Sequence, residues 1–380
     1  MKSKVSSLLL VLMIVIFGTV FLNKAVNFKK SYSDIELVYE NDNTNRYYYE
    51  SLSENAKIAY TLILPGLYEH SEKIEVPKIS DEEFDSLIYA LSYDNPDLFC
   101  VAGKSQLKSE NNIYYYIPTY THSANECQSK KTELENTVNK ALSVINTNAS
   151  EYEKELYVHD LICNICKYEL SENNLDNSNA YDVLVTGKAV CEGYAKAAKL
   201  LLDKLGVSNY LVTGEALDEN GKLNSHMWNI VNINGNNYHL DITWDDMDAD
   251  ELFSSNHIYF NVTDEMISKT HFKIQPSINN CNSTAFNYYN MNGMYFTRYD
   301  ETARKIIMNE IYKNYKNGND ICEFCFSNEN DYNLALKSLI QEDGLSEIIA
   351  QVEQIYGETD YSSIKYITDE NSYVFEFVFN

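Results

Sequence analysis

The segment from Gly187 to Gly206 constrains the fold most strongly, because it predicts a helix that begins at a cysteine. It reads GKAVCEGYAKAAKLLLDKLG, has no proline from Glu192 to Leu205, and is dominated there by the strong helix formers alanine, lysine and leucine. Gly206 is the predicted C-terminal stop. Cys191 then lies in the first turn, where unpaired N–H groups and the helix dipole favour a thiolate. A small buried residue is the alternative interpretation of this cysteine.

Downstream, the segment SHMWNIVNINGNNYHLDITWDD predicts a β-hairpin. Two runs rich in β-branched and aromatic residues flank Asn234-Gly235, the pair most typical of a two-residue turn. With this turn, one face of the hairpin forms an apolar surface for the core, made of Val231, Ile233, Tyr238, Leu240 and Ile242. The opposite face carries His226, Trp228, Ile230, His239 and Asp241. His226 and Asp241 are then diagonal neighbours, close enough for an imidazole–carboxylate hydrogen bond.

The helix and the hairpin together supply the three parts of a thiol-dependent acyl-transfer site. Cys191 is predicted to be the nucleophile, His226 its base, and Asp241 the carboxylate that orients the imidazole. His239 is the alternative base, because it shares the predicted face. Its other interpretation is a strand histidine that is either solvated or in a supporting role.

Three blocks of this sequence resemble the transglutaminase-like superfamily of papain-related cysteine enzymes. The blocks are GKAVCEGYAKAAKLLLDKLG, HMWNIV and NNYHLDITWDD, and they occur in the family's order between Ala180 and Asp246. The resemblance implies an α+β fold with a papain-like core, in which the nucleophile stands at a helix N-terminus packed on an antiparallel sheet. It also implies catalytic roles for Cys191, His226 and Asp241. The upstream chain, which includes DNPDLF, resembles the leader region of bacterial members of membrane-anchored or secreted type.

Acyl transfer also needs hydrogen-bond donors for the oxyanion that forms during the reaction. The backbone N–H of Cys191, at the helix start, is the natural first donor. Tyr181 and Trp228 are the candidates for a side-chain donor. Trp228 and Trp244 are expected mainly as walls of the cleft or as core residues.

The first part of the chain, residues 1–30, is predicted to be a signal peptide or a membrane anchor. Lys2 and Lys4 precede an apolar run from Leu8 to Leu22, which is marginal in length for a membrane span. No small-x-small cleavage site is well placed after the run, so an uncleaved anchor is favoured. The body is therefore expected outside the cytoplasmic membrane and attached to it, with secretion as the alternative.

Three further parts are expected along the chain. Residues 31–148 are predicted to form a mostly helical region with a small sheet, within which Ser80 and Glu83 form a capping box. Residues 149–275 are the predicted catalytic domain. Residues 276–380 are a predicted α+β module whose role is packing or partner binding.

Eight cysteines include two CxxC pairs, Cys163/Cys166 and Cys322/Cys325, but neither pair predicts a zinc site. The first lies within a predicted helix, and the second lies in a predicted strand whose i and i+3 side chains face opposite ways. A zinc knuckle needs a tight turn instead. His159 shares the helix face of the first pair, where core packing is preferred to a ligand role. No metal and no cofactor are expected.

The net charge of −26 bears on the class of partner. Binding to phosphates needs clusters of lysine and arginine, so no nucleic-acid partner is expected. The folded body is also not expected to adhere to anionic lipid, which leaves the N-terminal segment as the membrane contact. The expected partner is a protein or peptide substrate, with cell-wall peptide as one candidate.

The predicted triad leaves the acyl acceptor open. Water as acceptor would make the protein a cysteine peptidase or amidase, whereas an amine would make it a cross-linking transglutaminase. Hydrolysis is favoured, because the segment between the cysteine and the aspartate is short and offers little chain for a second, water-free acceptor site. The alternative from another functional class is a non-catalytic surface binding protein that retains the fold.

Overall fold

The computed structural model describes residues 32, 35–37, 45–170, 178–218, 220–246, 256–277, 280–317, 321–357 and 364–379. The chain divides into two units, residues 1–37 and 38–380, and the helices and strands that the structure describes all belong to the second. The predicted signal peptide or anchor lies outside the described residues. Among the described helices, none combines the length and the apolar character needed to cross a membrane.

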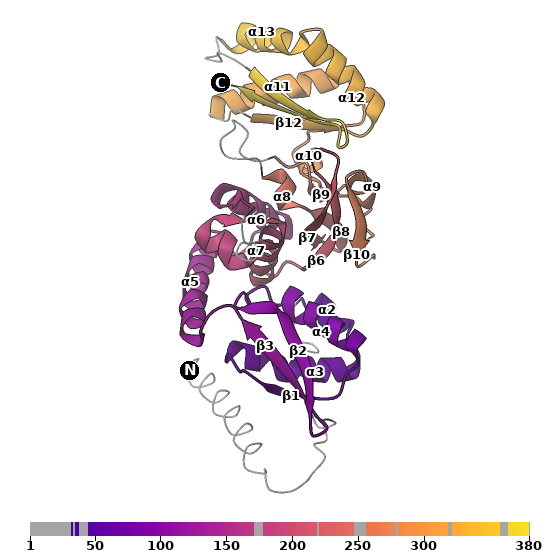
Figure 1. The fold of residues 1–380 in the computed structure, drawn as a ribbon. Helices are drawn as coiled ribbons and strands as arrows, with labels where there is room; N and C mark the ends of the chain where they lie inside the picture. Colours follow the sequence, from indigo (N-terminus) through magenta and orange to yellow (C-terminus); the bar gives the residue numbers. More distant parts are fainter. Residues whose placement is uncertain are drawn as a thin grey trace. The chain divides into compact units, whose positions relative to one another are not determined.

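Residues 45–120 build helices around a small antiparallel sheet of strand order β1-β3-β2 (Figure 1). The elements are α2 (Tyr47–Glu50), α3 (Glu54–Tyr68), β1 (Ile74–Val76), α4 (Asp81–Tyr93), β2 (Val101–Glu110) and β3 (Ile113–Tyr120). The predicted capping box is present at α4. The Ser80 side chain accepts the Glu83 N–H, and the Glu83 carboxylate accepts the Ser80 N–H.

The middle of the chain contains the helices and the sheet that carry the predicted catalytic residues. In chain order these elements are α5 (Ala124–Leu142), α6 (Glu151–Ile165), β4 (Lys167–Tyr168), β5 (Lys188–Ala189), α7 (Cys191–Lys204), β6 (Asn209–Leu217), β7 (Leu223–Ile233), β8 (Asn236–Leu240), α8 (Ile242–Asp245), β9 (Phe260–Val262), α9 (Asp264–Ile267), β10 (His271–Gln275) and α10 (Tyr288–Met291). The sheet is antiparallel throughout, with strand order β10-β6-β7-β8-β9. Helix α7 packs on β6 and β7. The predicted α+β class, with the nucleophile's helix on an antiparallel sheet, is confirmed.

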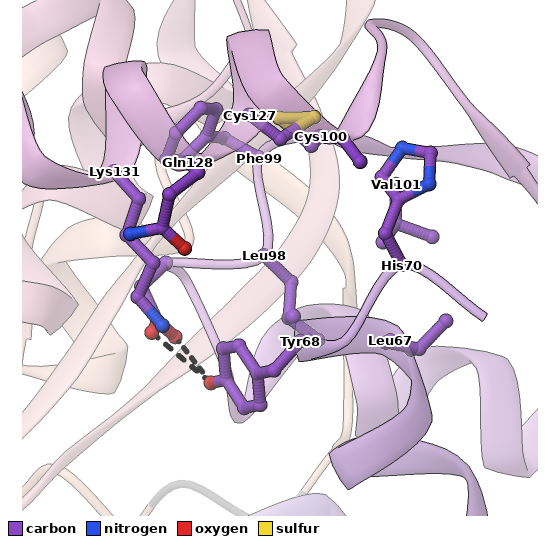
Figure 2. A pocket seen from close by; sticks show the side chains of 12 residues that line it. Leu67, Tyr68, His70, Leu98, Phe99, Cys100, Val101, Cys127, Gln128 and Lys131 are labelled. Atoms are coloured by element: carbon purple, nitrogen blue, oxygen red, sulfur yellow. Dashed lines mark hydrogen bonds between the residues drawn. A yellow bond between two sulfur atoms is a disulfide. The ribbon is translucent and has the colours of Figure 1, made fainter.

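A disulfide between Cys100 and Cys127 joins the start of β2 to α5 (Figure 2). It borders a small pocket of about 50 Å³, which Tyr68 and Lys131 also line. The Lys131 ammonium lies 4.2 Å from the centre of the Tyr68 ring, and the Tyr68 hydroxyl donates to Asp97 over 2.9 Å. None of the predicted catalytic residues lines this pocket, so it is separate from the candidate site.

Helix α7 has the start and the end that its sequence predicts. It begins at Cys191 and ends in a Schellman motif. In that motif the Val207 N–H donates to the Leu202 carbonyl over 2.9 Å, and the Gly206 N–H donates to the Asp203 carbonyl over 3.1 Å. Gly206 has a φ of 74°, the left-handed conformation that favours glycine.

The hairpin of β7 and β8 has the predicted register. Asn234 and Gly235 have positive φ values of 50° and 82°, as a two-residue turn of this kind requires, and Ile233 pairs with Asn236. The predicted apolar face is buried in one core together with α6 and α7, and comprises Val231, Ile233, Tyr238, Leu240 and Ile242. Because this face is fixed in the core, the residues that alternate with it must point to the other side of the sheet.

The C-terminal part forms a four-stranded sheet of order β11-β12-β14-β13 with helices packed against it (Figure 1). Its elements are β11 (Tyr295–Phe296), α11 (Glu301–Asn317), β12 (Ile321–Phe326), α12 (Glu329–Leu336), a π-helical turn (Lys337–Gln341), α13 (Gly344–Tyr356), β13 (Ile364–Asp369) and β14 (Val374–Phe379). Cys322 and Cys325 are buried in two different cores, as expected for i and i+3 positions on a strand. Domain boundaries within the second unit remain a prediction.

Candidate active site

Cys191 is positioned by the short parallel pairing that precedes its helix. Strands β4 and β5 pair Tyr168 with Ala189, which brings the chain to α7 two residues later. Val190, the residue before the helix, offers no capping side chain, so the positive end of the helix dipole faces the thiol. Cys191 is partly exposed, whereas the other free cysteines are all buried.

His226 on β7 lies between the thiol of Cys191 and the carboxylate of Asp241. Its Nε2 is 2.6 Å from Oδ2 of Asp241, and the Cys191 side chain lies close enough to its imidazole to raise the pKa of His226. With Nε2 bonded to the carboxylate, Nδ1 is the ring nitrogen left for the thiol proton. The structure therefore places near one another the three residues that the sequence predicts as nucleophile, base and orienting carboxylate.

The charges of this group favour an imidazolium at His226. Burial alone would lower the pKa of His226, but the Asp241 carboxylate and the Cys191 side chain raise it to about 10. Burial alone would likewise raise the pKa of Asp241, but His226 and His271 hold it well below its usual range. The carboxylate is thus ionised and the imidazole protonated at neutral pH.

Asp241 is held by four hydrogen bonds, one of them from a histidine that the sequence analysis missed. Its Oδ1 accepts the N–H groups of Thr243 and Trp244, over 3.1 and 3.3 Å, and so caps α8. Its Oδ2 accepts from Nε2 of His271, over 3.0 Å, as well as from His226. His271 is fully buried on β10, far from the hairpin in sequence, and no local motif marked it.

His239, the alternative base, is placed elsewhere. The Trp228 indole donates to its Nδ1 over 3.0 Å, so its proton must be on Nε2, which donates to Asp264 over 2.8 Å. Burial lowers the pKa of His239. The structure therefore gives His239 the supporting role and leaves His226 at the thiol. The expectation that Trp228 donates to an oxyanion is corrected, because its only N–H is already used.

Tyr181 is also corrected as a candidate oxyanion donor. Its hydroxyl donates to the Glu133 carboxylate on α5 over 2.6 Å. Its ring stacks on Phe99 with centroids 5.2 Å apart, and the Lys130 ammonium lies 4.2 Å from its centre. These contacts anchor the approach to α7 against α5, so the residue supports the fold around the site.

Tyr168 lies near the candidate site, although the sequence analysis did not identify it. Burial raises its pKa first, and the nearby charges of Cys191 and Asp241 raise it further. The residue is 41% exposed. Trp244 forms the expected wall on the histidine side, with its ring 6.1 Å from that of His226.

Residues 138–249 match the family model of the transglutaminase-like superfamily, and this segment contains the whole triad. A comparison with curated proteins finds no match. Among solved structures, the crystal structure of a transglutaminase has 18% sequence identity and a TM-score of 0.26, covering 45% of this chain and 50% of that one.

Two further solved structures are similar to part of the chain. A protein from Cytophaga hutchinsonii, proposed to be a cysteine protease, has 16% identity and a TM-score of 0.24, covering 37% of this chain and 61% of its own. A protein from Parabacteroides distasonis, proposed to be a protease, has 12% identity and a TM-score of 0.23, covering 37% and 35%. The chain thus spans less than two thirds of the length of each of these three proteins.

Proposed function

We propose that this chain, whose residues 138–249 match the transglutaminase-like superfamily model, is a cysteine enzyme that transfers acyl groups from peptide or glutamine amides. One observation carries the proposal. His226 is hydrogen-bonded through Nε2 to the ionised carboxylate of Asp241, and the Cys191 side chain lies close enough to its imidazole to raise the pKa of His226. A binding protein has no need of this charged arrangement, whereas a thiol nucleophile requires it.

The reaction follows from the chemistry of the thiolate. In the thiolate–imidazolium pair the Cys191 proton is held at Nδ1 of His226, and the sulfur attacks the amide carbon to give a tetrahedral oxyanion. The backbone N–H of Cys191 is the first donor to that oxyanion, and the Tyr168 hydroxyl is the candidate for the second. His226 then returns the proton to the leaving nitrogen. A thioester remains, and an acceptor resolves it.

We favour water as the acceptor. A transferase must shield the thioester from water, and the two tryptophans were the candidates to line such a tunnel. Trp228 is fully buried and its indole is bound to His239, which leaves Trp244 alone beside the site. Between β6 and β7 the Asp218 N–H donates to the Lys222 carbonyl, which joins the ends of the two strands and leaves little chain there for a lid.

The test supplies a glutamine-containing peptide together with a fluorescent primary amine and follows both products by mass spectrometry. Hydrolysis predicts release of free acid that exceeds amine incorporation, and Cys191→Ala should abolish both. Amine incorporation that outpaces acid release would instead identify a cross-linking enzyme. If neither product forms and Cys191 is unreactive to alkylation, the chain is a binding protein that retains the fold.

The place of action is proposed from the N-terminal sequence. A basic start followed by an apolar run supports an extracytoplasmic body attached to the membrane, where wall peptides and surface proteins are the available amides. Protease added to intact cells should then digest the body of the protein. Protection of the body until the cells are lysed would contradict this location.

A further inference from the structure

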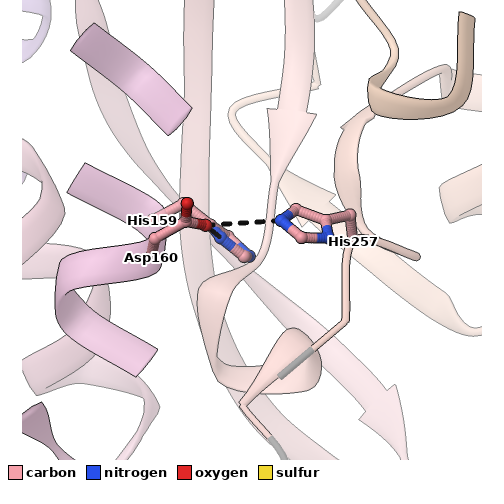
Figure 3. A group of neighbouring side chains, drawn as sticks. All are labelled: His159, Asp160 and His257. Carbon is pink, nitrogen blue, oxygen red and sulfur yellow. Dashed lines mark hydrogen bonds and ion pairs between the residues drawn. The ribbon is translucent and has the colours of Figure 1, made fainter. Parts of the chain in front are cut away.

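In the part of the chain that the structure describes, three groups of side chains bring potential metal-ligand atoms within 4.8 Å of one another. One group is the candidate active site. A second surrounds His239, whose single proton is fixed by the Trp228 indole and used by a carboxylate. The third consists of His159, Asp160 and His257, and the proposed reaction makes no use of it (Figure 3).

One carboxylate oxygen is the centre of the third group. Oδ1 of Asp160 is 2.9 Å from Nδ1 of His159 and 3.3 Å from Nε2 of His257. Figure 3 shows the carboxylate beside the two rings, whose centroids are 4.8 Å apart. The His159 side chain is fully buried, while that of Asp160 is 46% exposed. The carboxylate therefore gives the group a path to solvent.

The outer nitrogen of each ring also faces a carboxylate. Nε2 of His159 is 3.3 Å from Oδ2 of Asp245, which follows the active-site aspartate by one turn of α8. Nδ1 of His257 is 2.9 Å from Oε2 of Glu323 on β12. Histidines that bind metals almost always donate their outer N–H to such a carboxylate, which fixes the tautomer and turns the lone pair inward.

Counting protons shows what this arrangement lacks. A neutral imidazole has one N–H, and the outer carboxylates of His159 and His257 each take one. Two inner lone pairs then face the Asp160 oxygen, so three acceptors converge with no donor between them. Two further protons, one on each ring, or one divalent cation would satisfy these acceptors. Either choice adds two positive charges beside the carboxylates of Asp160, Asp245 and Glu323. The cation avoids two imidazolium rings in close, buried contact.

A nearby thiol does not change this count. Sγ of Cys163 is 3.9 Å from Nε2 of His159, but a thiol is a weak donor and the same nitrogen already faces the Asp245 carboxylate at 3.3 Å.

We propose that His159 Nδ1, Asp160 Oδ1 and His257 Nε2 bind one zinc ion, with water as the fourth ligand. Zinc takes tetrahedral nitrogen and oxygen ligands at about 2.0–2.2 Å, which sets the ligands about 3.3 Å from one another. The two separations at Asp160, 2.9 and 3.3 Å, are close to this value. Two imidazoles favour zinc over calcium or magnesium. The ion would brace α6 against the segment that leads into β9.

The experiment uses the full chain with Cys191→Ala, so that the nucleophile cannot bind metal. The metal-free protein is titrated with zinc in competition with a chromogenic chelator. One zinc per chain is expected. Asp160→Asn should weaken its binding at least 10-fold, because a charged ligand is lost at a site exposed enough for the fold to be retained. His257→Gln should do the same, whereas His122→Gln, at an exposed histidine, should change nothing.

Cobalt substitution identifies the ligands directly. Cobalt in this site should give the visible bands of a four-coordinate ion without a thiolate charge-transfer band, since no cysteine is among the proposed ligands. Three results would overturn the proposal. They are the lack of stoichiometric zinc binding, zinc affinity that is the same in both variants and the parent, and a thiolate band in the cobalt spectrum.

Discussion

The replacement of Asp241 by asparagine tests the electrostatics of the site most sharply. Asp241 is the main partner that raises the pKa of His226 to about 10, while burial acts in the opposite direction. Without the carboxylate, burial opposes the charge and only the Cys191 side chain still favours it, so the pKa of His226 should fall. At neutral pH the variant should therefore hold a neutral imidazole where the parent holds an imidazolium.

The same replacement should also reverse the tautomer of His226. If the new amide oxygen keeps the α8 cap in place of Oδ1, the amide N–H₂ faces Nε2 of His226 and displaces the proton to Nδ1, the side of the thiol. A ring in that state cannot accept the Cys191 proton. Turnover should drop by about 10³- to 10⁴-fold, the cost of the wrong tautomer in a triad of this kind.

The pKa of His226 also predicts how the stability of the fold depends on pH. A folded pKa of about 10 against about 6.5 in the unfolded chain means that His226 stabilises the fold fully below pH 6.5. This contribution is lost as the pH rises through 10, and it amounts to about 5 kcal/mol at most. In Asp241→Asn that alkaline loss of stability should disappear.

Imidazole resonances in nitrogen-15 NMR spectra report the charge and the tautomer of each ring. The chain has seven histidines, and His226→Gln assigns the resonance in question. In the parent, His226 should remain protonated up to about pH 10. A parent His226 that titrates near 6.5, or one that stays charged in Asp241→Asn, would refute the reasoning.

Three other variants test neighbouring parts of the structure. His271→Asn removes a hydrogen bond to the buried Asp241 carboxylate and should cost about 1.5–3 kcal/mol in urea unfolding; an unchanged midpoint would deny it that role. Tyr168→Phe should lower kcat by about 10- to 100-fold with little change in KM if its hydroxyl stabilises the oxyanion, whereas a change in KM alone would make it a binding residue. Cys100→Ser removes the disulfide to Cys127, which closes a loop with a sequence separation of 27, and should lower the free energy of unfolding by about 3.5 kcal/mol. Chemical reduction of this disulfide in the parent should give the same loss.

Much of the site could be predicted because its geometry is set by local rules. The Asn234-Gly235 turn fixes the register of β7 and β8, and alternation along the strands then places His226 and Asp241 on one face. The helix that begins at Cys191 is equally local, since its composition and its terminal glycine decide where it starts and stops.

Residues that the sequence analysis missed or misplaced depend on long-range contacts. His271 reaches Asp241 because β10 pairs with β6 at the far edge of the sheet, a pairing that no local pattern specifies. Tyr181 lies close to Cys191 in sequence, yet Glu133 on α5 takes its hydroxyl. The His159 face does pack on the core, as preferred, but its buried carboxylate partner, Asp245, comes from a distant part of the chain.

The most direct test of the central claim is the rate at which iodoacetamide alkylates Cys191 at pH 6, measured for this residue by peptide mass spectrometry. The same cysteine in the urea-unfolded chain serves as the reference, because an ordinary thiol with a pKa of about 8.5 is almost entirely protonated there. We predict that folding accelerates the reaction at least 10-fold, and that His226→Ala removes this acceleration while His122→Ala leaves it intact. Equal rates in the folded parent and in His226→Ala would contradict the claim that His226 activates the thiol.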